Sequence, residues 1–265
     1  MPYKFKARTR YFMPTNFGPL SNQRVCHYGD LTQLTILYLT DVDALAAYLP
    51  EPFEPADEPI VTVYCQVFRE VDFLAGRGYN VVGVNLAAVF NGKKDNFTGS
   101  YAAVLWENDT TPILTGRELL GAPKLYADIP DPQKEGNEWR FQCSLYGTKL
   151  IAGEIKNATL VDDAARKQIE KIANERLWMG WKYIPKANWR GSEVSFPTAI
   201  PARTTVSQAW MGECKHAFFK TTWNSSLYNS QILSGLRKLK VKEYRAGVVT
   251  KGTLDLLVGE SRKME

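Results

Sequence analysis

One lysine of this sequence has neighbours that could turn its side-chain amine into a nucleophile. Lys124 ends the stretch Gly116-Arg-Glu-Leu-Leu-Gly-Ala-Pro-Lys and is followed by Leu125. A lysine attacks a carbonyl group only when its uncharged form is populated, and burial among apolar side chains lowers the pKa of a lysine. Gly121 allows a sharp bend and Pro123 fixes its own φ, so the chain could turn Lys124 inward. On composition alone, an exposed loop lysine is the commoner alternative.

Other patterns that bind metals or carry catalysis are missing from the sequence. There are two histidines, His27 and His216, without H-E-x-x-H spacing, and no G-x-S-x-G elbow or glycine-rich phosphate loop. Four cysteines lie far apart, without a C-x-x-C pair: Cys26, Cys65, Cys143 and Cys214. A Ser-His-Asp triad is left open, although each histidine fits a hydrogen-bonded or surface role. We therefore expect no metal site.

Composition and charge are those of an ordinary soluble protein. The 265 residues carry a net charge of +5, and 45% are hydrophobic, which suits one large core. The one dense basic run, at 237–242, alternates Lys with Leu and Val, which predicts a strand or a strand entry rather than a nucleic-acid patch. Neither a signal-peptide core nor an apolar run of about 18 residues occurs. We expect a cytoplasmic protein with reduced thiols and no nucleic-acid or membrane partner.

Most of the sequence has the pattern of β-strands, separated by turn signals such as Asn91-Gly92 and Glu107-Asn-Asp. Three helices are expected, at 40–49 with Thr40 or Asp41 as the cap, at 162–178, and less clearly at 226–238. We find no repeat or linker, so residues 1–265 are expected to form one mainly β (α+β) domain with a few peripheral helices. Its antiparallel strands should close into a barrel or sandwich. The expected strands are 60–68, 81–90, 101–106, 139–145, 204–210, 217–222 and 244–258.

The segment Thr115-Gly-Arg-Glu-Leu-Leu-Gly-Ala-Pro-Lys-Leu resembles the active-lysine loop of the acetoacetate decarboxylase family. Leu49-Pro-Glu-Pro-Phe-Glu, Phe90-Asn-Gly and Gln208-Ala-Trp-Met-Gly follow in the family's order, so the resemblance spans nearly the whole chain. It implies a barrel-like antiparallel fold and a homo-oligomer. It also implies that Lys124 forms a Schiff base with a small carbonyl substrate. The protonated imine would be the electron sink, so no cofactor would be needed.

The chain departs from the family's pattern around this lysine. A second lysine follows the nucleophile in the decarboxylase, where this chain has Leu125, and the family's acidic residues fall at Tyr64 and near Val81. Relatives that use the imine for aldol condensation or dehydration of pyruvate-like substrates carry a polar residue at the position of Leu120. The family's substrate-facing arginine falls near Leu31. The substrate-binding residues that the resemblance implies are Leu31, Val81, Leu120 and Leu125, with Arg24 as a second candidate for the arginine.

Two tyrosines are candidates for a proton-transfer hydroxyl. Tyr64 and Tyr79 lie where the family's acids or their neighbours fall, and the alternative for each is a core aromatic. Glu118 is a further catalytic candidate, although an ion pair with Arg117 that orients the loop is an alternative.

We therefore expect a Schiff-base lyase that acts through Lys124 on a small or apolar carbonyl or keto-acid substrate, with a lean towards aldol, retro-aldol or dehydration chemistry. The lean follows from the loss of the decarboxylase's charged residues, because a site that lacks a polar contact changes its substrate. Decarboxylation of a β-keto acid such as acetoacetate is the alternative. A non-catalytic protein that binds an apolar ligand is a third possibility.

Overall fold

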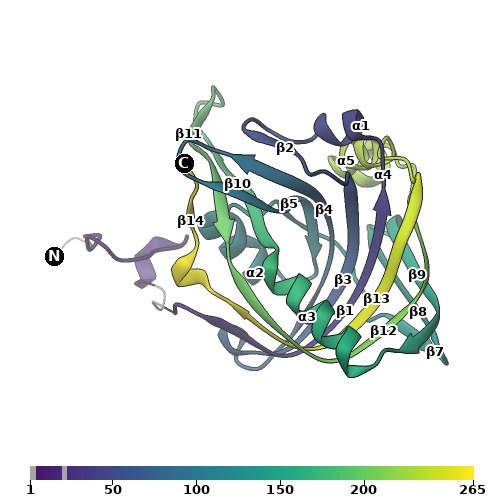
Figure 1. The fold of residues 1–265 in the computed structure, drawn as a ribbon. Coiled ribbons are helices and arrows are strands. Elements are labelled where there is room, and N and C mark those ends of the chain that lie inside the picture. The colour runs from purple at the N-terminus through teal and green to yellow at the C-terminus, as the bar shows by residue number, and fades with distance from the viewer. Residues whose placement is uncertain (1–3, 20–22) are drawn as a thin grey trace.

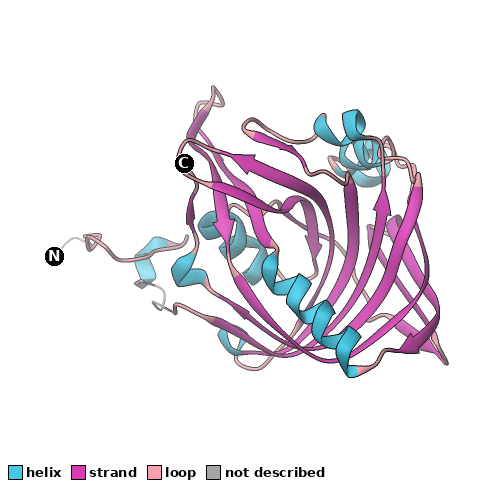
Figure 2. Cartoon of the chain, in the orientation of Figure 1, coloured by secondary structure: helices cyan, strands magenta, loops and turns pink. Residues whose placement is uncertain are grey.

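The computed structural model describes residues 4–19 and 23–265, and one large β-sheet dominates it (Figures 1 and 2). The strands are β1 (Cys26–Leu39), β2 (Phe53–Pro55), β3 (Ile60–Val71), β4 (Tyr79–Asn91), β5 (Asn96–Glu107), β6 (Lys124–Tyr126), β7 (Gln133–Glu135), β8 (Glu138–Leu145), β9 (Thr148–Leu160), β10 (Leu177–Pro185), β11 (Ser192–Ile200), β12 (Ala202–Phe218), β13 (Glu243–Leu256) and β14 (Arg262–Lys263). Their order is β14-β11-β10-β5-β4-β3-β1-β13-β12-β9-β8-β7, with β2 paired to β4 and β6 paired to β5. The expectation of a mainly β protein is confirmed.

The sheet curls strongly but stays open. Its two end strands, β14 and β7, are not paired with each other in the described part of the chain, so the expectation of closure into a barrel is wrong. Both end strands are short, and all their residues are exposed. Short, charged edge strands discourage pairing with other chains, so this sheet protects its edges without closing.

Short helices lie around the sheet. They are η1 (Thr15–Phe17), α1 (Val42–Ala46), η2 (Asp72–Leu74), α2 (Thr110–Thr115), η3 (Gly116–Leu120), α3 (Asp163–Glu175), α4 (Trp223–Ser226), α5 (Asn229–Leu236) and η4 (Val258–Glu260). The expected helix at 40–49 is present as α1, and its cap is Asp41, which accepts hydrogen bonds from the amides of Asp43 and Ala44. The helix at 162–178 is present as α3, which lies over β12 (Figure 1) and is capped by Asp162. The helix expected at 226–238 is present in part as α5, and α4 ends where the expected range begins, at Ser226.

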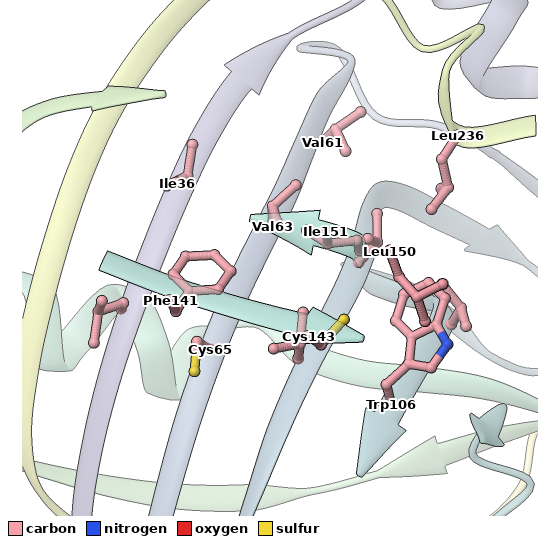
Figure 3. Packing of buried hydrophobic residues seen from close by; sticks show 14 of the residues in the cluster. Ile36, Val61, Val63, Cys65, Trp106, Phe141, Cys143, Leu150, Ile151 and Leu236 are labelled. Atoms are coloured by element: carbon pink, nitrogen blue, oxygen red, sulfur yellow. The ribbon is translucent and has the colours of Figure 1, made fainter. Parts of the chain in front are cut away.

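A large hydrophobic core fills the inside of the curled sheet. Phe141 and Cys143 of β8 belong to the same buried cluster as Val63 and Cys65 of β3, which Figure 3 shows from close by. The helices α1, α4 and α5 lie together at one end of this core (Figure 2), where Leu45, Leu233 and Leu236 extend the cluster. The two halves of the sheet therefore pack on each other.

A second hydrophobic cluster covers the opposite face of β1, β3, β4 and β5, and includes Tyr28, Tyr64, Tyr79 and Leu105. Residues that are paired in register on neighbouring strands project from the same face of a sheet. The pairs Tyr64–Gly83, Gly83–Leu105 and Leu105–Lys124 form one such row across β3, β4, β5 and β6. The side chain of Lys124 therefore projects from the same face of the sheet as the second cluster.

The basic run at 237–242 is a strand entry, one of the two alternatives predicted for it: it follows the end of α5 at Leu236 and leads into β13 at Glu243. One expected strand is formed only in part. The segment 217–222 leaves the sheet after Phe218, at the end of β12. Among the described residues, no helix is long and apolar enough to cross a membrane.

Candidate active site

Lys124 begins β6, with only 8% of its surface exposed. Its Nζ lies 2.9 Å from Oε1 of Glu107, the last residue of β5, and donates a hydrogen bond to the carbonyl oxygen of Pro112 at 3.1 Å. Glu107 is 1% exposed, and its Oε2 has no hydrogen-bond partner within the described part of the chain. The lysine and the glutamate therefore form an ion pair that is almost closed off from solvent.

The segment before Lys124 is helical rather than a loop. Asp109 caps α2, which continues directly into η3, a π-helix. π-helical turns are rare and are found often at functional sites. Gly121 ends the π-helix with a φ of 72°, a left-handed conformation that favours glycine. The Leu105 amide then binds the Pro123 carbonyl at 3.0 Å, which fixes β6 beside β5 and turns Lys124 towards Glu107.

Gly116 leaves the space that the lysine side chain occupies. A Cβ atom at this position would lie 2.6 Å from Cε of Lys124 and 2.7 Å from both its Cδ and its Nζ. Ordinary carbon contacts are near 3.5–4.0 Å. The φ of Gly116 is −66°, which any residue can adopt, so glycine is needed here for space and not for backbone conformation.

A cavity of about 350 Å³ opens above Lys124. Its charged lining residues within the described chain are Lys124 and Arg10, and the remainder of the wall is mostly apolar. Cavities of this size suit small ligands that are fixed by a few polar groups. The residues that line it are Arg10, Phe12, Gln23, Cys26, Tyr28, Phe73, Thr111, Pro112, Thr115, Gly116, Leu119, Leu120, Lys124, Leu256 and Val258.

Phenol groups stand near the ion pair. Tyr28 lines the cavity, and its hydroxyl lies 3.3 Å from that of Tyr79. Burial raises the pKa of Tyr28, Tyr64 and Tyr79, and the negative charge of Glu107 adds to the rise for each. These hydroxyls therefore keep their protons at neutral pH and can act as hydrogen-bond donors.

Burial also raises the pKa of Glu107, while the neighbouring charge of Lys124 lowers it. Loss of solvent penalises the charged form of each partner, and the ion pair offsets part of that penalty. The distance of 2.9 Å between Nζ of Lys124 and Oε1 of Glu107 places the two groups within reach of a direct proton transfer.

The structure brings some of the expected residues to the site. Lys124 and Leu120 both line the cavity, and Val81 is paired in register with Glu107. Tyr64 and Tyr79 do not line the cavity but belong to the buried cluster beneath it, as does Leu31.

Other expected residues lie elsewhere. Leu125 packs against the core on the opposite face of the sheet, and Arg24 is exposed and outside the cavity lining. Glu118 is also outside the lining, and the expected ion pair between Arg117 and Glu118 is not among those of the described residues. Arg117 instead donates a hydrogen bond to the carbonyl oxygen of Lys124 at 2.9 Å. Arg117 therefore holds the backbone at Lys124 in place, since a guanidinium can donate to a carbonyl oxygen as well as to a carboxylate.

Glu107, Arg10 and Tyr28 were not expected at the site. In the sequence, Glu107-Asn-Asp is a turn signal. That the carboxylate of Glu107 lies beside Lys124 follows only from the pairing of β6 with the end of β5. Arg10 and Tyr28 reach the cavity from segments more than 90 positions before Lys124. Local spacing could not reveal these three residues.

Comparisons with known proteins identify the family to which the chain is similar. The pattern of the family described as acetoacetate decarboxylase (ADC) matches residues 12–263. An acetoacetate decarboxylase of Clostridium botulinum is 33% identical over 196 residues, which cover 69% of this chain and 71% of that protein.

Solved structures share the fold. A structure from a study of acetoacetate decarboxylase is similar with a TM-score of 0.74 at 20% identity, over 95% of this chain and 93% of the other. The enduracididine biosynthesis enzyme MppR, complexed with the condensation product of pyruvate and imidazole 4-carboxaldehyde, has a TM-score of 0.71 at 15% identity, over 99% of this chain and 98% of the other. The chain therefore belongs to the acetoacetate decarboxylase family and is an acetoacetate decarboxylase-like lyase.

Proposed function

We propose that this protein is a Schiff-base-forming lyase in which Lys124 condenses with a small, largely apolar carbonyl substrate, and that its chemistry is aldol, retro-aldol or dehydration. The observation that carries the proposal is the position of the lysine. Its Nζ is buried at the base of a cavity of about 350 Å³, beside a carboxyl group that can exchange a proton with it. A lysine in such surroundings can act as a nucleophile.

The amine itself supplies the electron sink of the reaction. The lysine nitrogen attacks the carbonyl carbon, water leaves, and the protonated imine then withdraws electrons from the neighbouring carbon–carbon or carbon–hydrogen bond. Cleavage of that bond gives an enamine. The enamine either takes up a proton or attacks an aldehyde.

The charges around Lys124 favour aldol or dehydration chemistry. A β-keto acid carries its carboxylate two bonds from the carbon that joins the lysine, so this group would lie close to the Glu107 carboxylate. Like charges repel strongly where water is excluded. Besides Lys124, the described lining offers one cation, Arg10, to oppose that repulsion. The similarity of the fold to MppR, which was solved with a condensation product, is consistent with this preference.

Decarboxylation of a β-keto acid is the second candidate. It is supported by the 33% identity with the Clostridium botulinum acetoacetate decarboxylase. The apolar wall would also favour conversion of a charged carboxylate into uncharged carbon dioxide. In that case Glu107 would have to bind its proton before the substrate enters.

Product analysis separates these candidates. The protein is incubated with ¹³C-labelled acetoacetate, or with a labelled small neutral ketone and an aromatic or aliphatic aldehyde, and the mixture is followed by NMR spectroscopy. Our proposal predicts a condensation or dehydration product and little labelled carbon dioxide. The Lys124→Met variant should lose this product, and Lys186→Met, at an exposed lysine, should retain it. Carbon dioxide as the main product would favour the second candidate, and equal activity of Lys124→Met would contradict both.

We also propose that residues 1–265 act as one domain and that the enzyme is a cytoplasmic homo-oligomer. The first long strand, β1, pairs with the last long strand, β13, which supports one domain. Large exposed side chains, among them Met13, Phe17 and Trp189, could be buried between subunits. Light scattering coupled to size-exclusion chromatography would measure the oligomeric state, and a mass of 29.9 kDa would contradict the oligomer.

A further inference from the structure

We propose that Glu107 is the acid–base catalyst that takes the proton from Lys124 before imine formation and returns it when water leaves. This inference rests on the proposed Schiff-base function. Glu107 touches the reacting atom directly, because its Oε1 lies 2.9 Å from Nζ of Lys124. A general base or acid must lie within hydrogen-bond reach of the proton that it transfers, and this pair satisfies the requirement.

A purely structural role explains Glu107 poorly. A buried ion pair contributes little net stability, because removing both charges from water costs about as much as their attraction returns. Oε2 of Glu107 also has no hydrogen-bond partner in the described part of the chain, although the residue is only 1% exposed. Buried carboxylate oxygens without partners are unusual, and this one is free to accept a proton.

The surroundings of Glu107 isolate this proton exchange. Lys124 and Arg10 are the charged residues of the described cavity wall, and the positive charge of each opposes the rise in the pKa of the Cys26 thiol that burial causes. Three phenols lie within electrostatic reach of Glu107, and all are held in their protonated form by burial. The titratable groups that face the ion pair are Cys26, Tyr28, Tyr64, Tyr79 and Asp109.

Lys124 and Glu107 together supply and accept every proton that imine formation requires. The Lys124 ammonium transfers one proton to the Glu107 carboxylate, which leaves a free amine and a carboxylic acid. The amine forms a C–N bond to the carbonyl carbon, and a proton moves from nitrogen to the former carbonyl oxygen. Glu107 then donates its proton to this hydroxyl, the C–O bond breaks, and water leaves. The products are a protonated imine and a carboxylate, so no other donor or acceptor is required.

This mechanism predicts a particular pH profile. Imine formation requires that Lys124 and Glu107 together carry one proton. With two protons there is no free amine to attack the carbonyl carbon. With none there is no carboxylic acid to protonate the leaving hydroxyl. The rate of imine formation should therefore rise and then fall with pH, as for any coupled acid and base. In Glu107→Gln no carboxylic acid is left to lose its proton as the pH rises, so the rate should rise with pH without falling again.

The test is the rate at which cyanoborohydride traps a carbonyl compound on the protein between pH 5 and 10, read by intact mass. The variants are Glu107→Gln, Glu107→Asp and the matched control Glu193→Gln, at an exposed glutamate. Our proposal predicts a rate about 10²–10⁴-fold lower in Glu107→Gln at the wild-type optimum, and a change from a bell-shaped to a rising profile. Glu107→Asp keeps the carboxyl group and should keep the bell shape at a reduced rate. Glu193→Gln should match the wild type.

The outcomes separate the two proposals. An adduct on wild-type Lys124 with the same rate and the same bell-shaped profile in Glu107→Gln would overturn the role of Glu107 and leave the Schiff-base function in place. A wild-type profile that only rises with pH would do the same, even if no Glu107 variant folds. Absence of any adduct on the wild-type protein would overturn the Schiff-base function itself.

Discussion

Removal of Lys124 should destabilise the protein because it leaves Glu107 buried and unpaired. In Lys124→Met the side chain stays unbranched but is one atom shorter, and it loses the charge that faces Glu107 Oε1 at 2.9 Å. Removing one partner of a buried ion pair typically costs about 3–5 kcal/mol, because the remaining charge is uncompensated. With Glu107 at 1% exposure, little relief from water is available. We therefore expect the free energy of unfolding to fall by about 3–5 kcal/mol at pH 8.

The size of this loss should depend on pH. Burial raises the pKa of Glu107 above its ordinary value of 4.5, and loss of Lys124 removes the main influence that lowers it. Between the pKa of the unfolded state and that of the folded state, the folded protein binds the extra proton, so stability falls as the pH rises. The slope can reach about 1.4 kcal/mol per pH unit. Lys124→Met should therefore be closest to the wild type near pH 5 and furthest from it at pH 8.

Urea denaturation followed by tryptophan fluorescence at pH 5, 6, 7 and 8 measures this effect. The double variant Lys124→Met/Glu107→Leu is the decisive control, because replacing both charges with apolar groups is often neutral or stabilising. It should recover most of the lost stability and show little pH dependence from this site. Equal instability of the single and double variants, or a loss in Lys124→Met that does not change with pH, would refute the reasoning.

Two further predictions concern the cavity. Gly116→Ala should displace the lysine amine, since the new Cβ would lie 2.6 Å from Cε of Lys124; we expect the rate of adduct formation to fall by about 100-fold and the stability by about 1–3 kcal/mol. A normal trapping rate in a folded Gly116→Ala protein would contradict the tight fit. Arg10→Met should weaken binding of carbonyl substrates that carry a carboxylate by about 10–100-fold and leave the binding of neutral ketones unchanged. The reason is that Arg10 is the cation of the described lining that is not paired with Glu107. Steady-state KM values for matched charged and neutral substrates would measure the difference, and an equal change for both classes would argue against this role.

The sequence was sufficient for the elements whose signals are local. The alternation at 60–68 predicts the middle of β3, and the caps of α1 and α3 are where acidic residues precede a helical pattern. β1, the central strand at 26–39, was not predicted, because Gly29 and Asp30 interrupt its apolar pattern. Register shifts occur at this place in its pairing with β13. Tertiary pairing on both sides forms this strand in spite of its local sequence.

The candidate site divides in the same way. Lys124 was found because the segment that contains it resembles the active-lysine loop of the family, whereas composition alone favours an exposed loop lysine. Its burial in the structure agrees with the prediction. Glu107, the partner of the Lys124 amine, was not found from the sequence, because the parallel pairing of β5 with β6 brings Glu107 next to Lys124. The π-helix before the lysine was also missed, since a Gly-Arg-Glu-Leu-Leu run carries no signal that distinguishes a π-helix from a loop or an α-helix. Residue pairs of this kind depend on register, which short motifs do not determine.

The most direct test of the Schiff-base account is chemical trapping at one residue. The protein is incubated with acetoacetate, pyruvate and a series of small apolar ketones and aldehydes, reduced with borohydride, digested and mapped by mass spectrometry. The account predicts a mass increase on the peptide that contains Lys124, equal to the carbonyl compound minus water plus two hydrogens, and its loss in Lys124→Arg. No adduct with any of these compounds, or equal labelling in Lys124→Arg, would contradict it.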